Sequence, residues 1–249
     1  MALRRTTALL KQLNSSTMSL KPIKVYTAGT PNGQKVHNFV EELKEAYGSK
    51  TGFSCEYESI DMSANQQKED WFLKINPNGR IPAITDPNSS PDEFHVFETA
   101  AILLWLEKEY DPDHLFSFSS TEQDGERYRN EALQWMFFVH GGIGPMQGQL
   151  NHFGHYAPED IPYAKTRYLN ETKRLYSVVE SRLEGREWLV GPGKGKYSIA
   201  DINAFPWMAW GQYSGVAYND IGPNTMAWLK RNMDRSAVKA GMNIPKKSE

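Results

Sequence analysis

Two different periods of hydrophobic and polar positions divide the chain near residue 110. Residues 22–110 alternate between short apolar runs, typical of strands, and segments with apolar positions three and four apart, typical of helices. The strands are predicted at 23–27, 55–60, 81–85 and 94–97. The resulting order, β-α-β-α-β-β-α, predicts a mixed sheet with helices on its faces, which is an α/β domain.

The first predicted helix has apolar residues at positions 36, 39, 40 and 43, which places them on one buried face. Gly48 is expected to end it, because glycine tolerates the left-handed cap conformation. A short helix around Trp71 and Phe72 and a longer one over 98–109 complete this half.

The second half carries only helical periodicity, so we expect an all-α domain over 124–245. Residues 111–123 are polar and are expected to form a linker between the two domains. The helices are predicted near 124–140, 160–184, 199–213 and 223–234, with a break at 141–145. Pro206 is expected to bend or interrupt the third helix. Ser198 and Asp201 have the spacing of a capping box at its start.

Residues 1–20 form a leader that contains cations and hydroxyl residues but no acid. Their leucines fall roughly on one helical face, which is typical of a mitochondrial presequence, and a disordered leader is the alternative. We therefore expect a cytoplasmic protein, or a mitochondrial matrix protein if the leader is a presequence. Residues 21–110 then form the first domain.

The composition is that of a globular protein, with 39% hydrophobic and 23% charged residues. A net charge of −2 gives no reason to expect nucleic acid or an acidic membrane as a partner. No apolar run approaches the ~20 residues of a membrane span. Cys55 is the only cysteine, so an intramolecular disulfide is impossible and no metal site is expected.

The segment from Val25 to Val36 is the most informative part of the sequence, because an apolar strand ends there and an amphipathic helix begins. The first turn of a helix has unpaired N–H groups and a partial positive charge, which favours a bound anion. Thr30 and Asn32 stand at this start with polar side chains. The segment therefore predicts an anion site.

Several motifs together resemble the glutathione transferase superfamily over residues 21–242. Within it, the chain resembles the nu-class transferases of bacteria, including their disulfide-bond oxidoreductases, and the fungal nitrogen-regulator-like branch. The motifs are Gly29–Val36, Asn76–Pro82, Glu98-Thr99, Gly144–Met146 and Ile161–Ala164. The resemblance implies a thioredoxin-like N-terminal domain (βαβαββα) that binds glutathione, followed by an all-helical C-terminal domain.

The resemblance implies that Thr30 and Asn32 are the catalytic residues. They would hold the glutathione sulfur as a thiolate, the reactive form of a thiol. Pro82 is expected to be a cis proline that exposes the backbone of Ile81 to the cysteinyl unit, against the alternative of an ordinary trans edge-strand proline. Arg80, next to it, is placed among the glutathione-binding residues.

The ends of glutathione are assigned in the same way. Thr99 would bind the γ-glutamyl carboxylate at a helix start, and Glu98 would pair with the ammonium, although both residues also suit a simple helix cap. Gln67 would touch the glycyl end, with Gln66 as an alternative one position away. A solvated helix face is the other interpretation of this glutamine.

Gln134 and Arg167 match positions of the helical domain that reach glutathione, in the same subunit or in a partner subunit. An exposed salt bridge is an alternative for the arginine. The resemblance also implies a homodimer. Five aromatic side chains are candidates for the electrophile pocket or, alternatively, for the core: Tyr128, Trp135, Phe138, Phe153 and Tyr156.

Two rival catalytic residues have weaker support. Tyr26 lies inside the first strand, where packing is the simpler role. Cys55 lies at the start of a strand, where a small buried residue is expected. Since no Cys-x-x-Cys motif exists, disulfide reduction by this protein needs two glutathione molecules.

The sequence thus predicts a glutathione-dependent enzyme. It would reduce small disulfides, conjugate glutathione to electrophiles, or do both, with glutathione as a cosubstrate and no permanently bound cofactor. The alternative is a regulatory module that binds glutathione and holds a protein partner, as in the fungal nitrogen regulator. That regulator carries an Asn-rich prion-like segment, which this chain lacks.

Overall fold

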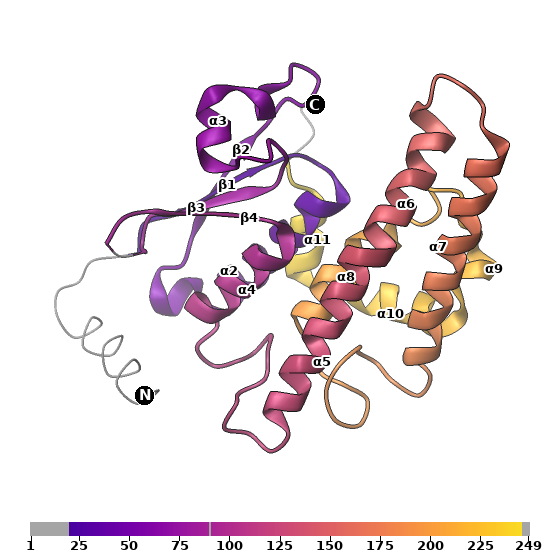
Figure 1. Cartoon of the computed structure of the whole chain (residues 1–249). Helices are drawn as coiled ribbons and strands as arrows, with labels where there is room; N and C mark the ends of the chain where they lie inside the picture. Colours follow the sequence, from indigo (N-terminus) through magenta and orange to yellow (C-terminus); the bar gives the residue numbers. More distant parts are fainter. Residues whose placement is uncertain (1–19, 90, 246–249) are drawn as a thin grey trace.

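The computed structural model describes residues 20–89 and 91–245. The predicted leader lies outside them, apart from Leu20. Figure 1 shows a smaller lobe with the sheet and a larger lobe made of helices. The smaller lobe contains β1 (Ile23–Thr27), α2 (Pro31–Thr51), β2 (Cys55–Ser59), α3 (Asp70–Ile75), β3 (Ala83–Asp86), β4 (Phe94–Phe97) and α4 (Thr99–Tyr110). The predicted βαβαββα order and the mixed sheet are confirmed.

The sheet has the strand order β2-β1-β3-β4. β1 pairs in parallel with β2 and antiparallel with β3, and β4 runs antiparallel to β3. Alternate residues of β1 face opposite sides, as the period of a strand requires. Ile23 and Val25 pack into the core beneath α2 and α4, whereas Tyr26 packs with Phe72 of α3 on the other face.

Helix α2 differs from its prediction in two ways. It continues through Gly48 to Thr51 and ends at Gly52, whose φ of 76° is the left-handed cap conformation. It is also buried on nearly all sides, because α8 and α11 of the larger lobe cover the face opposite the sheet. Polar side chains such as Gln34 and Lys35 are therefore buried along with the predicted apolar face.

The larger lobe is all-helical, as predicted. Its elements are α5 (Gly125–Phe138), α6 (Gly144–Asn151), α7 (Pro162–Arg182), α8 (Ile199–Ala209), α9 (Tyr218–Ile221), α10 (Pro223–Asp234) and α11 (Ser236–Met242). The expected break at 141–145 is wrong. The chain passes from α5 to α6 through a π-helical turn, Val139–Ile143, and a second such turn, His152–Tyr156, extends α6. Among the described residues, none of the helices is both long and apolar enough to cross a bilayer.

Helix α8 is the centre of this lobe, and every residue from Ile199 to Met208 is buried. The predicted capping box forms at its start, where the Asp201 carboxylate accepts the Ser198 N–H at 3.1 Å. Pro206 does not interrupt the helix, which continues to Ala209.

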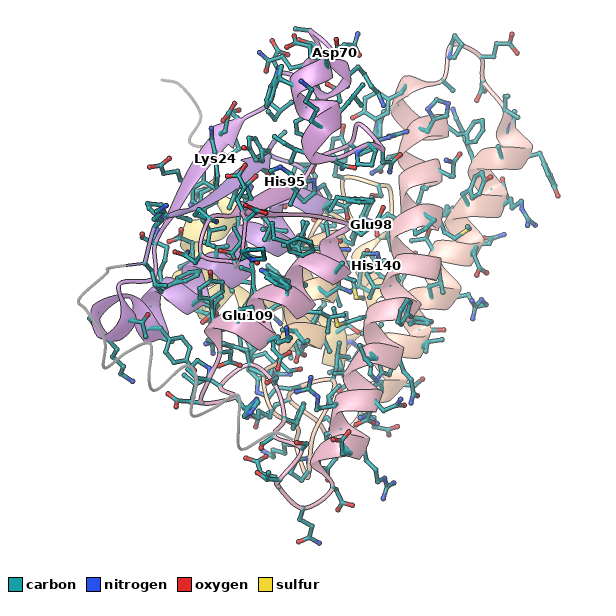
Figure 2. All side chains as sticks on the ribbon, turned by 60° about the vertical axis from the view of Figure 1, so that its left-hand side comes forward. Lys24, Asp70, His95, Glu98, Glu109 and His140 are labelled. Carbon is teal, nitrogen blue, oxygen red and sulfur yellow. The ribbon has the colours of Figure 1, made fainter. Side chains whose placement is uncertain are left out.

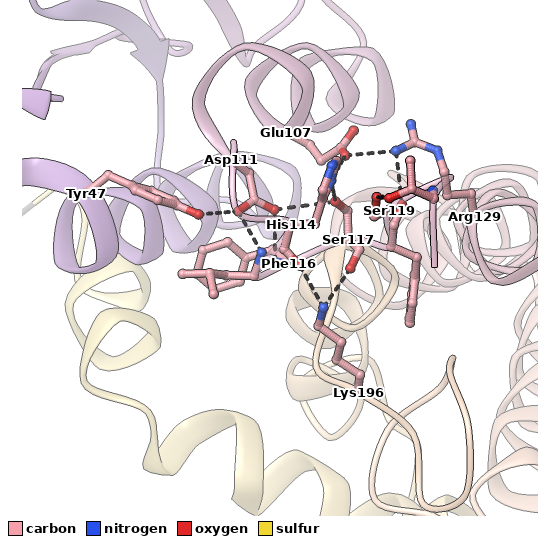
Figure 3. Close-up of polar contacts among 12 residues, drawn as sticks. Tyr47, Glu107, Asp111, His114, Phe116, Ser117, Ser119, Arg129 and Lys196 are labelled. Carbon is pink, nitrogen blue, oxygen red and sulfur yellow. Dashed lines mark hydrogen bonds and ion pairs between the residues drawn. The ribbon is translucent and has the colours of Figure 1, made fainter. Parts of the chain in front are cut away.

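The segment 111–123, predicted as a linker, is packed between the two lobes (Figure 3). The buried Asp111 carboxylate accepts hydrogen bonds from the Tyr47 hydroxyl at 2.6 Å and from the Phe116 N–H at 2.9 Å. Lys196 donates to the carbonyls of His114 and Ser117. These bonds tie the connection to α2 and to the larger lobe.

Candidate active site

A cleft of about 850 Å³ lies between the two lobes. One wall is the start of α2, another is the loop before β3, and a third is the start of α4. The wall on the side of the larger lobe is formed by the π-helical turn Val139–Ile143, by α6 and Tyr156, and by Trp207 of α8. Eight of the ten predicted site residues line it: Thr30, Asn32, Gln67, Arg80, Ile81, Pro82, Glu98 and Thr99.

Thr30 caps the start of α2, since its backbone is extended and its Oγ1 accepts the Gly33 N–H at 3.1 Å. The hydroxyl proton is left free to donate toward the cleft. Gly33 allows this tight start, because a Cβ there would lie 2.3 Å from the Ala28 carbonyl oxygen. The first turn of the helix therefore packs directly on the end of β1.

The side chain of Asn32 is oriented by a hydrogen bond from the larger lobe. Trp207 of α8 donates its Nε1–H to Asn32 Oδ1 at 2.9 Å. Because an indole N–H only donates, the amide must turn its oxygen toward Trp207 and its Nδ2 the other way. Thr30 and Asn32 thus place an O–H and an N–H donor beside the N-terminus of α2, in the same cleft.

The Ile81-Pro82 peptide bond is cis, as predicted. Strand pairing begins at Ala83, so the backbone of Ile81 lies just beyond the paired part of β3. The loop before it is held by Asn76, whose Nδ2 donates to the Arg80 carbonyl at 2.7 Å. The predicted turn is thus a rigid wall of the cleft.

Glu98 joins β4 to α4 with φ of 69°, in the left-handed region that a non-glycine residue rarely adopts. Such conformations cost about 1–3 kcal/mol and persist where the surrounding structure enforces them, often at functional sites. Thr99 follows as the first residue of α4 and is buried.

Gln67, rather than Gln66, lines the cleft. Gln66 is occupied elsewhere, since its Oε1 accepts the Asp61 N–H at 2.8 Å. The Oε1 of Gln67 is buried and has no hydrogen-bond partner among the described residues. Such a group is costly to leave unpaired, which favours a polar ligand beside it.

Gln134 and Arg167 do not line this cleft within a single chain. Gln134 is exposed on α5, donates to Asn130 Oδ1 at 2.7 Å, and lines a separate hollow of about 690 Å³. Arg167 is exposed on α7. Their predicted role therefore requires a partner subunit.

Neither rival catalytic residue lines the cleft. Tyr26 is packed in the core below α3. Cys55 lies at the start of β2, and burial raises the pKa of its thiol, which opposes thiolate formation. In the part of the chain that the structure describes, no three His, Cys, Asp or Glu residues are grouped as for a metal.

Sequence reasoning missed two polar residues at the base of the cleft. Lys35 of α2 is buried, and desolvation lowers the pKa of its ammonium to about 7. His140 lies in the first π-helical turn, where burial and the charge of Lys35 lower its pKa to about 4. Thr99 joins them, since its Oγ1 lies 3.5 Å from Lys35 Nζ and 3.1 Å from His140 Nε2.

Comparison with known proteins agrees with this geometry. Residues 31–109 match the glutathione S-transferase N-terminal domain, and residues 153–236 match the glutathione S-transferase C-terminal domain. The chain belongs to the glutathione S-transferase family. Among curated relatives of this family, it is 42% identical over 191 residues to the disulfide-bond oxidoreductase YfcG of Escherichia coli, covering 76% of this chain and 80% of that one.

Two solved structures, a glutathione transferase homolog and Ure2p, share the fold over about nine-tenths of this chain. One is a homolog from Lodderomyces elongisporus with two GSH per subunit, with a TM-score of 0.80 and 36% identity over 91% of this chain and 100% of that one. Another is Ure2p in complex with glutathione, with a TM-score of 0.76 and 29% identity over 90% and 99% of the two chains.

Proposed function

We propose that this protein is a glutathione-dependent enzyme that reduces small disulfides with the glutathione thiolate and conjugates glutathione to electrophiles at the same site. The observation that carries this proposal is the pair of donors, Thr30 and Asn32, at the helix start that lines the cleft. The named activity of YfcG, a disulfide-bond oxidoreductase, favours an enzyme over a regulatory module that only binds glutathione.

The energies are sufficient for thiolate formation. A free thiol titrates near ~8.5, and lowering its pKa by about two units requires roughly 2.7 kcal/mol. A helix N-terminus contributes up to about 2 kcal/mol in partly buried geometry. A hydrogen bond to an anion contributes about 1.5–3 kcal/mol, so Thr30 and Asn32 supply the remainder.

Disulfide reduction then proceeds in two exchanges. The glutathione thiolate attacks one sulfur of the substrate disulfide, the S–S bond breaks, and the departing thiolate takes a proton. A second glutathione thiolate attacks the mixed disulfide, releasing the other substrate thiol and glutathione disulfide. No protein thiol takes part.

In the bound state, the exposed Arg80 and the buried Gln67 would hold the glycyl part of glutathione, and Ile81 would pair with its cysteinyl backbone. Glu98 and Thr99 would bind the γ-glutamyl head. We further propose a homodimer, in which Gln134 and Arg167 reach the glutathione of the partner. A cytoplasmic or mitochondrial matrix location is proposed with it.

The experiment measures the turnover of bis(hydroxyethyl) disulfide with glutathione, and the formation of glutathione disulfide is the signal that is monitored. Thr30→Ala should lower kcat/KM by about 10- to 100-fold, because it removes one hydrogen bond to the thiolate. Thr30→Ser keeps both the bond and the helix cap and should retain most activity. Thr51→Ala, at the other end of α2, is the matched control. Binding of glutathione without turnover of any disulfide or electrophile would contradict the proposal.

A further inference from the structure

Lys35 is a buried cation that lacks a full set of partners. Its side chain lines the cleft, yet only 1% of the residue is exposed. An ammonium group has three N–H donors. Within the described residues, its one hydrogen bond is the long one to Thr99 Oγ1 at 3.5 Å, and no carboxylate lies within ion-pair distance. A buried charge in this state is costly unless a ligand pairs with it.

The Thr99 hydroxyl is also set to bind an anion. His140 Nε2 lies 3.1 Å from both Thr99 Oγ1 and Asn203 Oδ1. Asn203 donates its Nδ2–H to the Met136 carbonyl, so its Oδ1 must accept from His140, and Nε2 carries the proton. Thr99 Oγ1 therefore accepts from Lys35 and shares the single Nε2–H of His140 with Asn203 Oδ1. Its own O–H is left to donate into the cleft.

We propose that Lys35 is the buried counter-ion of the α-carboxylate on the γ-glutamyl residue of glutathione, and that it binds this group together with the Thr99 hydroxyl. The inference rests on the proposed function, since it requires glutathione in the cleft. In this role, Lys35 supplies a full positive charge from α2, in addition to the partial positive charge at the N-terminus of α4.

The charges around this position match a zwitterion. Glu98 is exposed at the start of α4 and lines the cleft, whereas Lys35 lies buried at its base. Figure 2 shows Glu98 at the start of α4, close to His140 in the π-helical turn of the larger lobe. An amino acid head group bears an ammonium for Glu98 and a carboxylate for Lys35. A ligand that has a carboxylate but no ammonium group would pair with Lys35 and leave Glu98 without a partner.

Binding should be coupled to proton uptake. Glu98, just before α4, and His140, in the π-helical turn Val139–Ile143, are the titratable groups that face Lys35. His140 is neutral above a pKa of about 4, and desolvation lowers the pKa of Lys35 to about 7. A carboxylate beside Lys35 raises that pKa, so binding takes up a proton. Affinity should therefore be about tenfold weaker at about pH 8 than at about pH 6.

Calorimetry with S-methylglutathione tests the proposal, because the methylated ligand has no thiol that titrates. Its partner ligand is S-methyl-γ-aminobutyryl-cysteinylglycine, which lacks only the α-carboxylate. Wild-type protein should bind the second ligand about 10- to 100-fold more weakly. Lys35→Met should weaken binding of S-methylglutathione by about tenfold and show no pH dependence. Its preference for S-methylglutathione over the second ligand should fall by the same factor, and the preference that remains comes from the Thr99 hydroxyl and the start of α4.

Lys44→Met, on the same helix but outside the cleft, is the matched control and should behave as wild type. Lys35→Gln repeats the test if the methionine variant does not fold, and the two-ligand comparison on wild-type protein needs no variant. Wild-type protein that binds neither ligand contradicts the proposed function itself. If wild-type protein binds S-methylglutathione and the Lys35 variants bind it equally well, the role of Lys35 is overturned while the proposed function stands. The same conclusion follows if the variants discriminate between the two ligands as strongly as wild-type protein does.

Discussion

Asp201 links three parts of the larger lobe, which makes its replacement the sharpest test of the fold around α8. Its buried carboxylate accepts the Leu189 N–H at 3.0 Å, the Trp228 Nε1–H at 2.9 Å and the Ser198 N–H at 3.1 Å. Helix α8 also carries Trp207, which orients Asn32 in the cleft. Loss of Asp201 therefore affects both stability and the site.

The magnitude follows from the donors left unpaired. Asp201→Ala orphans three buried N–H groups, each of which costs about 1–3 kcal/mol, so we expect a loss of roughly 3–6 kcal/mol after partial relaxation. Asp201→Asn keeps one oxygen for Leu189 and Trp228 and leaves the Ser198 N–H unpaired, while the Ser198 hydroxyl can accept from the new amide instead of donating to the carboxylate. Its expected cost is about 1–3 kcal/mol.

Urea denaturation followed by tryptophan fluorescence measures both variants. Asp234→Ala, which removes an exposed ion pair with Lys230, is the control and should change stability by less than about 0.5 kcal/mol. Equal unfolding free energies for Asp201→Ala and Asp201→Asn would refute the reasoning, because the oxygen that asparagine retains would then contribute nothing to stability.

The same residue gives a pH dependence. Burial raises the pKa of Asp201 to about 6 in the folded protein, from an ordinary value of 3.8. The folded state therefore binds more protons than the unfolded state between these values. The contribution of Asp201 to stability should fall as pH rises through this window, and Asp201→Asn should lack that component.

Three further predictions concern the site, the contact between lobes and the thiol. Trp207→Phe removes the donor that orients Asn32, so kcat/KM for disulfide reduction should fall by about 3- to 10-fold in the turnover assay, and an unchanged value would contradict this role. Arg235→Ala leaves the buried Glu42 carboxylate without its partly exposed cation and should cost about 1.5–3 kcal/mol in urea unfolding, whereas a change below about 0.5 kcal/mol would be inconsistent with this pairing. Cys55→Ser should keep disulfide reductase activity within about twofold, since glutathione supplies both thiols; loss of turnover in folded protein would show that Cys55 takes part.

Local signals were enough to predict much of the site. The strand-to-helix turn before Thr30 and the capping box at Ser198 depend on residues a few positions apart, and both are confirmed. The sequence motifs likewise led to the cis Ile81-Pro82 bond and to the residues that line the cleft.

Other features depend on distant parts of the chain, which no local pattern reveals. The two glycines near the end of α2 look equivalent in sequence. Only the positive φ of Gly52, before β2, identifies it as the cap. Lys35 resembles a solvated helix residue, but it is buried against Thr99 at the start of α4 and His140 of the π-helical turn.

The region after α5 shows that helix propensities of single residues can also mislead a prediction. Gly141, Gly142, Gly144 and Pro145 are helix breakers by propensity, yet the chain stays helical through a wide π-helical turn. Pro145 is the second residue of α6, directly after the π-helical turn. His140 lies in this turn and lines the cleft, and no local sequence pattern predicts the turn.

The central claim is that a glutathione thiolate is held at the start of α2, because the chain has no suitable thiol of its own. A crystal structure of the protein soaked with glutathione tests it most directly. We expect the sulfur within hydrogen-bond distance of Thr30 Oγ1 or Asn32 Nδ2, about 3–4 Å. A sulfur lying well away from residues 30–33, with the tripeptide bound in the cleft, would contradict the account.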